Sequence, residues 1–427
     1  MALYLKNGTF INWRTFEFSK ANLLVEEGDS GKIYILPASS KIPEGSSIID
    51  CSGMYVTKAF ANGHHHVYSA LAKGMPAPEK NPVNFVEILK YVWWKLDRCL
   101  DSEMIRISAL VTAIECAKNG VTFVIDHHSS PNFIKGSLEL IAQAFDEVGI
   151  AHLLSYELSD RDGSAKTNQA LEETESYLND WQGLVGLHAS FTLSDKTFTR
   201  AISLAEKHNT GIHIHVAEDT YDQKHCEEKY RKTVVERIDS FGGLNSPKSI
   251  LVHCLHLNDT ERKTIKNSGV WVAQNTESNL NNGVGFFNSI GLGENIMLGT
   301  DGMHSDMLRA AKASYFTGLN FDKIDLKGIY QRFRNMQRYL LQNNFKGNAE
   351  NNLVVLDYKP TTEFNAENFL GHFIFGLESK HVRHVISGGK LIVKDQKVTR
   401  VDEDEILKTS RELSVRLWNK LNIVEPE

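Results

Sequence analysis

Several features that mark particular classes of protein are missing from this chain of 427 residues. No run of lysine or arginine could neutralise a series of phosphates, and Lys+Arg 47 against Asp+Glu 53 gives a net charge of -6, so nucleic acid is not an expected partner. No window of about 20 apolar residues occurs. The start, MALYLKNGTFINWRTF, has no charged segment followed by an apolar core. We therefore expect no membrane contact and a cytoplasmic location.

Cysteine is also scarce, and none of the five cysteines belongs to a C-x-x-C pair. Their number is odd, and they are scattered along the chain at Cys51, Cys99, Cys116, Cys226 and Cys254. A disulfide framework or a cysteine-based metal site would need a tighter spacing. We therefore expect five buried, reduced thiols.

The chain is rich in short apolar, β-branched runs. From residue 54 onward these runs alternate with helical patterns. This alternation is typical of parallel βαβ units. Eight runs can be counted, at residues 55–63, 121–126, 150–157, 183–190, 211–216, 249–256, 269–276 and 295–301. Between the first two, DSEMIRISALVTAIECAKNG has polar capping residues at its start, one apolar face and Gly120 as a stop, which predicts a helix.

Eight parallel strands with intervening helices predict an α/β fold, a TIM-like (β/α)8 barrel, whose chemistry lies at the carboxyl ends of the strands. A doubly wound sheet is the main alternative. It would usually carry a glycine-rich phosphate loop after its first strand, and NGHHH at that place is no such loop. We place the barrel in residues 57–349.

The two ends of the chain differ from this middle part. LYLKNGTFIN, KIYILPAS and SIIDCSG are typical of short strands separated by turns, and NNLVVLDYKP and VRHVISGGKLIVKDQKV have the same character. The sequence predicts that residues 1–56 and 350–427 together form a small, sandwich-like β domain that flanks the barrel. An amphipathic helix, EDEILKTSRELSVRLWNKLN, is expected to close the chain.

Histidine and acidic side chains gather where the barrel strands are expected to end. In strand order they are His64 and His66, His213 and His215, His253 and His256, and Asp301. Alternate strand residues point to opposite faces, so His64 and His66 share one target while His65 faces away. One strand-end histidine is more often a structural polar residue than a ligand, but their joint occurrence indicates a metal site. Imidazoles with a carboxylate suit Zn²⁺ or Fe²⁺, with a position left for water.

A further carboxylate stands close to this predicted site. Glu218 follows His215 by three residues in HVAE, so it would leave the strand end near whatever His215 binds. A divalent metal lowers the pKa of its water towards about 7, and a nearby carboxylate can take the proton and pass it to a leaving group. The pattern predicts hydrolytic chemistry.

Four motifs in this order, ANGHHH, HIHVAE, LVHCLHL and LGTDG, resemble those of the amidohydrolase superfamily, in the branch of cytosine-deaminase-like and chlorohydrolase-like enzymes. With WWKLDRCLD, DHHSSP and GLHASFTLSD added, the likeness is greatest to the SsnA family of aminohydrolases. It covers nearly the whole chain, and the ordered set is specific although each motif alone is weak. One departure is KAFANG before the histidines, where related enzymes often have Pro-Gly.

The resemblance implies four metal ligands, which are His64, His66, His215 and Asp301. Members that bind two metals carry a lysine at the end of strand four that becomes carboxylated and bridges them. The segment GLVGLHASF has no lysine. One divalent metal ion per chain, zinc or iron, is therefore expected.

The resemblance also implies the catalytic roles. Glu218 would shuttle protons, His253 would polarise the substrate, and Asp301 would also orient or deprotonate the water. His188 in LHASFTLS and Asn279 in TESNL match positions that commonly line the substrate pocket.

Other histidines of the chain are open to two interpretations. His127 and His128 end the second strand, and one of them, for which we take His128, is expected either to contact substrate or to make a structural hydrogen bond. His213 lies one step deeper than His215 on the same face and could support a ligand. Trp93 and Trp94 are expected to pack in the core.

The function expected from all of this is a hydrolase that deaminates a small amino-substituted nitrogen heterocycle. Ring opening of a cyclic amide would use the same residues and stays open as an alternative. A non-haem iron enzyme with a two-His-one-carboxylate site would leave two histidines surplus. A scaffold that had lost activity would be expected to lack a ligand, and none is missing. Whether copies of the chain associate is left open.

Overall fold

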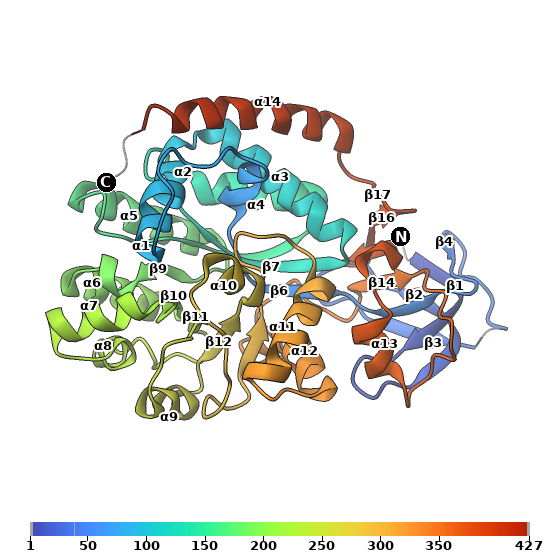
Figure 1. Cartoon of the computed structure of the whole chain (residues 1–427). Helices are drawn as coiled ribbons and strands as arrows, with labels where there is room; N and C mark the ends of the chain where they lie inside the picture. The colour runs from blue at the N-terminus through green and yellow to red at the C-terminus, as the bar shows by residue number, and fades with distance from the viewer. Residues whose placement is uncertain (1–2, 38, 425–427) are drawn as a thin grey trace.

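The eight apolar runs correspond to eight strands in the computed structural model, which describes residues 3–37 and 39–424 (Figure 1). Their bounds are β6 (Phe60–His65), β7 (Val121–His128), β8 (Ala151–Tyr156), β9 (Val185–Ala189), β10 (Ile212–Val216), β11 (Ile250–His253), β12 (Trp271–Gln274) and β13 (Ile296–Leu298). All pairings between neighbours are parallel. Helices cover the outside of the strands.

The strands form a closed ring. β6, β7 and β8 make one sheet and β9 to β13 another. Isolated bridges join them, Leu154 to Gly183 on one side and His65 to Asp301 on the other. At the second junction, the backbone amides of Thr300 and Asp301 donate to the His64 carbonyl at 3.0 and 3.1 Å. The fold is therefore the predicted TIM-like barrel, and its closure puts the ends of β6 and β13 side by side.

The helices between the strands follow the predicted alternation. The segment after β6 holds the short helices η1 (Val67–Ala72), α1 (Phe85–Ile88), η2 (Leu89–Trp93) and α2 (Trp94–Cys99). The longer elements that follow are α3 (Ser102–Lys118), α4 (Ser137–Val148), α5 (Ser164–Asp180), α6 (Asp195–Lys207), α7 (Thr220–Tyr230), α8 (Val234–Ser240), α9 (Asp259–Ser268), α10 (Thr276–Asn282), α11 (Met307–Phe321) and α12 (Leu326–Gln342), with the single turn η3 (Ser190–Thr192) after β9. The helix predicted after residue 100 is α3. The side chain of Asp101 accepts from the Met104 amide at its start.

The barrel interior is filled with apolar side chains up to the level of the site. Residues such as Phe123, Ile125 and Val252 from the strands form one buried cluster with Met336 and Tyr339 of α12. α12 therefore closes the end of the barrel that lies opposite the carboxyl ends of the strands. The site has a rigid packed floor as a result.

Both ends of the chain contribute to one nine-stranded sheet that flanks the barrel (Figure 1). Its strands are β1 (Leu3–Ile11), β2 (Phe18–Val25), β3 (Ile33–Leu36), β4 (Ser47–Asp50), β5 (Tyr55–Lys58), β14 (Leu353–Leu356), β15 (Val382–Ser387), β16 (Lys390–Lys394) and β17 (Lys397–Val398). The order is β17-β16-β15-β14-β5-β1-β2-β3, with β4 also paired to β1. The run 55–63, which the sequence suggested was one strand, divides at Ala59. Its first half pairs with β14 and β1, and its second half joins the barrel.

Three further helices follow β14 along the chain, α13 (Phe369–Phe375), the short η4 (Ser379–His381) and α14 (Glu403–Leu421). α14 lies across the barrel helices at the top of Figure 1, where it contacts α2 and α3. Its Trp418 donates from Nε1 to the Leu71 carbonyl at 2.9 Å. The C-terminal helix therefore packs over the segment that follows β6.

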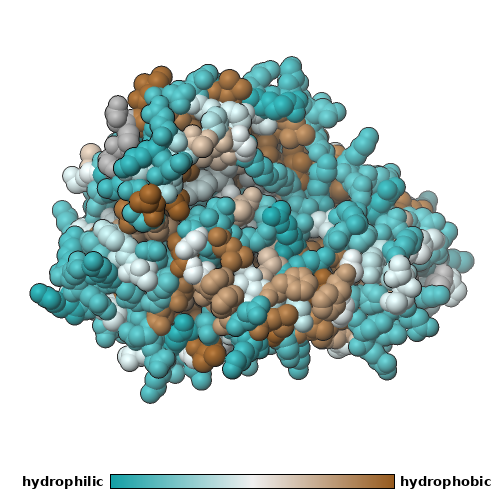
Figure 2. All heavy atoms as spheres, in the orientation of Figure 1, coloured by the Kyte–Doolittle hydropathy of each residue, from teal (hydrophilic) through white to brown (hydrophobic). Residues whose placement is uncertain are grey.

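All five cysteines are buried and unpaired, as expected from their spacing. Figure 2 shows that the visible face is mostly hydrophilic, with apolar side chains gathered in smaller areas. Among the residues that the structure describes, no helix combines the length and the apolar character needed to span a membrane.

Candidate metal centre

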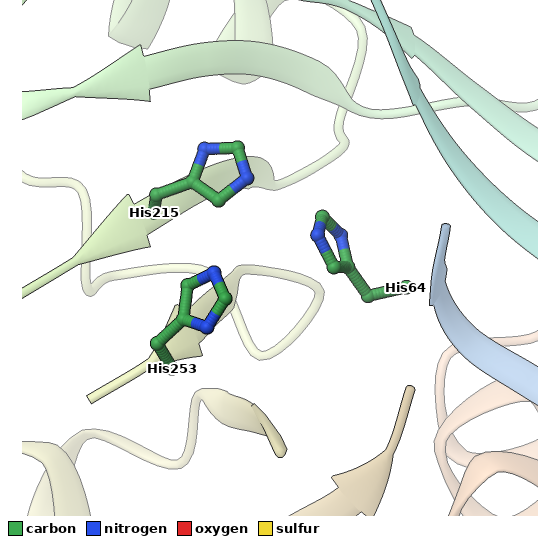
Figure 3. Close-up of side chains that lie close together, drawn as sticks. All are labelled: His64, His215 and His253. Carbon is green, nitrogen blue, oxygen red and sulfur yellow. The ribbon is translucent and has the colours of Figure 1, made fainter. Parts of the chain in front are cut away.

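Five side chains converge at the carboxyl ends of the barrel strands, and we call them the strand-end cluster. Its members are His64, His66, His215, His253 and Asp301, and His127 and Glu218 lie close enough to complete further groups of possible ligands with them. His66 Nε2 lies 3.2 Å from His215 Nε2 and 3.3 Å from Asp301 Oδ1, and His253 Nε2 lies 3.7 Å from Asp301 Oδ2. Figure 3 shows that the rings of three members reach one shared space from different strands. The predicted ligands are therefore brought together.

Hydrogen bonds at Nδ1, on the side of the ring away from the shared space, orient the imidazoles of His64, His66 and His215. His66 Nδ1 donates to the His127 carbonyl at 2.6 Å, and His215 Nδ1 donates to the His188 carbonyl at 2.8 Å. Because a carbonyl only accepts, each Nε2 must carry the free lone pair that faces the cluster. His64 Nδ1 is held differently, by His213 Nε2 at 3.0 Å. His213 thus stands in the supporting position that the sequence suggested for it.

The donor set fits a divalent metal ion. Nε2 of His64 is buried and has no hydrogen-bond partner, and an unpaired buried polar atom is costly. Groups drawn from the cluster place their ligand atoms within 4.8 Å of one another. Burial, reinforced by neighbouring histidines, lowers the pKa of His64 and His215 far below the ordinary range, so the rings are neutral and able to coordinate.

Asp301 supplies the negative charge of the site. Its Oδ2 accepts from Ser278 Oγ at 2.7 Å, and its Oδ1 accepts from the Gly302 amide at 2.7 Å. Burial alone would raise the pKa of this carboxyl, but the adjacent His66 and His253 hold it below its ordinary value. Asp301 is therefore ionised and can bind a cation.

Glu218 lies beside the cluster and not within the ring of imidazoles. Its Oε2 is 3.3 Å from His253 Nε2, and its Oε1 accepts from Asn282 Nδ2 at 3.4 Å. Burial raises the pKa of this carboxyl well above its ordinary value, and the charge of Asp301 adds to the effect. A carboxyl with a raised pKa can both take and release a proton near neutral pH.

The backbone at the strand ends is in an unusual conformation. His253, Asp301 and Ala217 have φ of 70°, 54° and 46°, in the left-handed region that side chains other than glycine seldom adopt. Val252 points into the apolar interior of the barrel, so strict alternation would turn His253 outward. The left-handed turn redirects His253 towards the cluster.

A cavity opens above the strand-end cluster, and we call it the rim cavity. It has a volume of about 60 Å³ and continues into space that is open to solvent. His66, His215, Glu218 and Asp301 form its polar floor. Its apolar walls include Phe85, Leu89, Trp93, Trp94 and Phe191. Apolar walls with a few convergent polar groups are typical of a small-molecule site.

The three predicted substrate contacts are placed differently. His188 lines the rim cavity, with Nδ1 2.9 Å from Thr192 Oγ1. Asn279 lies behind His253, where its Nδ2 donates to His253 Nδ1 at 2.7 Å. His128 pairs through Nε2 with Ser130 Oγ at 2.9 Å. Among the described residues, the cavity wall includes His188 but neither Asn279 nor His128.

Sequence reasoning missed several polar residues of the site. Glu157, after β8, lines the rim cavity with its Oε2 3.3 Å from Nδ1 of the buried His127. Asp97 also lines it and is paired with the buried Arg161. Glu157 is the last residue of the third predicted strand, at residues 150–157, so its strand-end position was the available signal.

The two tryptophans predicted to pack in the core have a second role in the structure. Trp94 is buried in the core, and Trp93 packs against that core as a partly buried side chain. Both also line the rim cavity. Trp93 ends the π-helical segment η2, and Trp94 begins α2. The segment after β6 therefore supplies an aromatic wall to the site.

The chain is similar to known deaminases over almost its full length. A 5'-deoxyadenosine deaminase of Methanococcus vannielii is 27% identical over 93% of this chain and 97% of its own. A 5-methylthioadenosine/S-adenosylhomocysteine deaminase of Thermococcus sibiricus is 26% identical over 92% of this chain and 94% of its own.

Solved structures share the same fold at lower identity. An adenosine deaminase from Xanthomonas campestris with bound zinc aligns with a TM-score of 0.82 at 18% identity, covering 98% of both chains. An atrazine chlorohydrolase from Arthrobacter aurescens complexed with zinc aligns with a TM-score of 0.80 at 14% identity, covering 96% of this chain and all of the other. The amidohydrolase family model matches residues 55–331, which hold the whole strand-end cluster. The resemblance found in the motifs is thereby confirmed, and the chain belongs to the amidohydrolase family.

Proposed function

We propose that residues 57–349 form the catalytic domain of a metal-dependent aminohydrolase, flanked by residues 1–56 and 350–427. The reaction removes an exocyclic amino group from a small nitrogen heterocycle. The observation that carries the proposal is the strand-end cluster with Glu218 beside it, on the floor of the rim cavity. The adenosine-type substrates named for the relatives make 6-aminopurine nucleosides the first class to test. The likeness to the SsnA family and the cytoplasmic location stay predictions.

The metal would be held by His64, His66, His215 and Asp301. Three imidazole nitrogens and one carboxylate oxygen are a usual set for zinc, and iron is the alternative. A divalent ion in this place would supply a water acidified enough to attack carbon near neutral pH. The backbone carbonyls behind His66 and His215 keep both rings in the tautomer that such binding requires.

Glu218 and His253 would handle the proton and the developing charge. Glu218 would take a proton from the attacking water and deliver it to the leaving amino nitrogen. Because His253 Nδ1 accepts from Asn279, its Nε2 carries a proton that it would donate to the negative charge forming on the ring. Asn279 therefore acts through His253 in this scheme, without touching substrate.

The proposed function is tested by measuring ammonia release from a panel of amino-substituted purines, pyrimidines and triazines, with metal-loaded protein. We expect release from at least one purine nucleoside, and none from a Glu218→Gln control. Ring opening without ammonia would support the cyclic-amide alternative instead. Oxygen uptake with a 2-oxo acid would contradict hydrolysis altogether.

We expect one tightly held divalent metal ion per chain. β9, where metal-bridging relatives carry a lysine, presents VGLHA, so no carboxylated lysine can join two ions. Elemental analysis of fully active protein should find one equivalent. Two equivalents would overturn the mononuclear arrangement, and full activity of metal-free protein would overturn the whole mechanism.

A further inference from the structure

A second large cavity lies at the opposite end of the barrel, between α12 and the flanking sheet, and we call it the basal cavity. It has a volume of about 880 Å³, within the usual range for ligand sites. Figure 1 shows α12 beside the flanking sheet, and residues of both line the cavity. Arg334 of α12 donates from Nη1 to the carbonyls of Lys58 and Ala59, which come just before β6. The cavity is therefore remote from the strand-end cluster.

The basal cavity is strongly basic. Five cationic side chains line it against a single carboxylate, that of the exposed Glu350, and they are Arg14, Lys58, Lys327, Arg334 and Arg338. Among the described residues, none of the five has a carboxylate oxygen within 4.0 Å, whereas many other lysines and arginines of the chain do. Among the described residues of the lining, Glu350 is the single carboxylate set against five cationic side chains.

Two of the cations are buried. Lys58 and Arg334 are only 6% exposed. Lys58 Nζ donates to the carbonyls of Asn348 and Ala349, and Arg334 uses Nε on Tyr330 Oη as well as Nη1 on the two backbone carbonyls. Burial, with Arg334 nearby, lowers the pKa of Lys58 to about 7. Buried cations without an anion are costly, so a bound anion would offset that cost.

The rest of the lining fits an aromatic ring. Trp13, Phe16 and Tyr330 contribute to the wall, and Ile33 and Ile35 of β3 add apolar surface. Trp13 already stacks with cations, because the Arg14 and Arg334 guanidinium carbons lie 4.5 and 5.6 Å from its ring centre.

One buried polar atom in the same lining has no partner. Gln337 is 3% exposed and donates from Nε2 to the Ala59 carbonyl at 3.2 Å, while its Oε1 accepts nothing. An unpaired buried acceptor in a cavity wall could accept from a donor on a ligand. We propose that the basal cavity is a binding site for a small aromatic anion, with the anionic group on the cations and the ring against the aromatic wall.

The test is calorimetric titration of the metal-loaded protein with 1-naphthyl phosphate, inorganic phosphate and 1-naphthol. We expect saturable binding of 1-naphthyl phosphate that is at least about tenfold tighter than that of either half alone, because charge and ring contribute together. The variant Arg14→Gln/Lys327→Gln should weaken it by at least about tenfold through the loss of two charge-assisted contacts. Both side chains are exposed, so the fold should survive.

Two controls locate the bound anion. Lys263→Gln changes an exposed helical lysine away from the cavity and should leave the affinity unchanged. His64→Ala should also leave it unchanged, because the strand-end cluster lies at the other end of the barrel. Three results would overturn the proposal. They are loss of binding in His64→Ala, an unchanged affinity in the Arg14→Gln/Lys327→Gln variant, and no binding by the unaltered protein. If inorganic phosphate binds as tightly as 1-naphthyl phosphate, the site binds the anionic group but does not recognise the aromatic ring.

Discussion

Replacing His64 with alanine is expected to abolish metal binding and turnover together while leaving the barrel folded. The imidazole is fully buried, and its unpaired Nε2 faces the space that His215 and Asp301 share. Without it, the site loses a ligand, and the attacking water is no longer acidified. Turnover should fall by at least about 10⁴-fold. Elemental analysis and ammonia release measure the two losses, and circular dichroism checks the fold.

His65→Ala is the matched control, because it removes the neighbouring imidazole. His65 is also buried, but its Nδ1 lies 3.2 Å from Thr300 Oγ1, and it does not belong to the strand-end cluster. Losing that contact should cost about 1–3 kcal/mol of stability, while metal content and turnover are retained. Equal loss of metal from both variants would show that the two histidines do not face opposite sides of the strand.

Much of the barrel could be predicted because its signals are local. The barrel strands are short and mostly apolar, and most of the long helices begin at a capping side chain, as α3 does at Asp101. The division of the run 55–63 at Ala59 could not be predicted. Both halves are extended, and only their partners differ: β14 comes from about 300 residues later in the chain.

The site was predictable where alternation along a strand decides the direction of a side chain. His213 and His215 of β10 share a face by parity. His64 and His66 also converge, although β6 ends at His65 and His66 lies just beyond it. His253 reaches the cluster only through a left-handed φ, which no pattern in LVHCLHL announces.

The residues that form the walls of the rim cavity were harder to predict, because their positions depend on contacts between distant parts of the chain. Trp93 and Trp94 belong to short helical turns between β6 and α3 whose path is set by packing, in part against α14. Glu157 was overlooked because a single strand-end carboxylate is common. Its importance follows from the buried His127, whose Nδ1 lies 3.3 Å from the Glu157 carboxylate.

Glu218→Gln should separate chemistry from metal binding. The substitution keeps the shape and the hydrogen-bonding reach of the side chain, but an amide cannot accept a proton at neutral pH. Glu218 lies beside His253 and Asn282, outside the four proposed ligands, so the metal content should stay at one equivalent. A positioned acid–base group contributes about 10²–10⁴-fold, so kcat should fall by at least that range while KM changes much less.

Asp301→Asn provides the contrast, because that carboxylate is proposed to touch the ion. Its oxygens Oδ1 and Oδ2 lie 3.3 Å from His66 Nε2 and 3.7 Å from His253 Nε2, respectively. A neutral amide in this place would weaken metal binding and turnover alike. The two variants should therefore differ in metal content although both lose activity. If Glu218→Gln also loses its metal, Glu218 is itself a ligand. If it keeps near-normal turnover, another group moves the proton, and Glu157, whose carboxylate also lines the rim cavity, becomes the next residue to substitute.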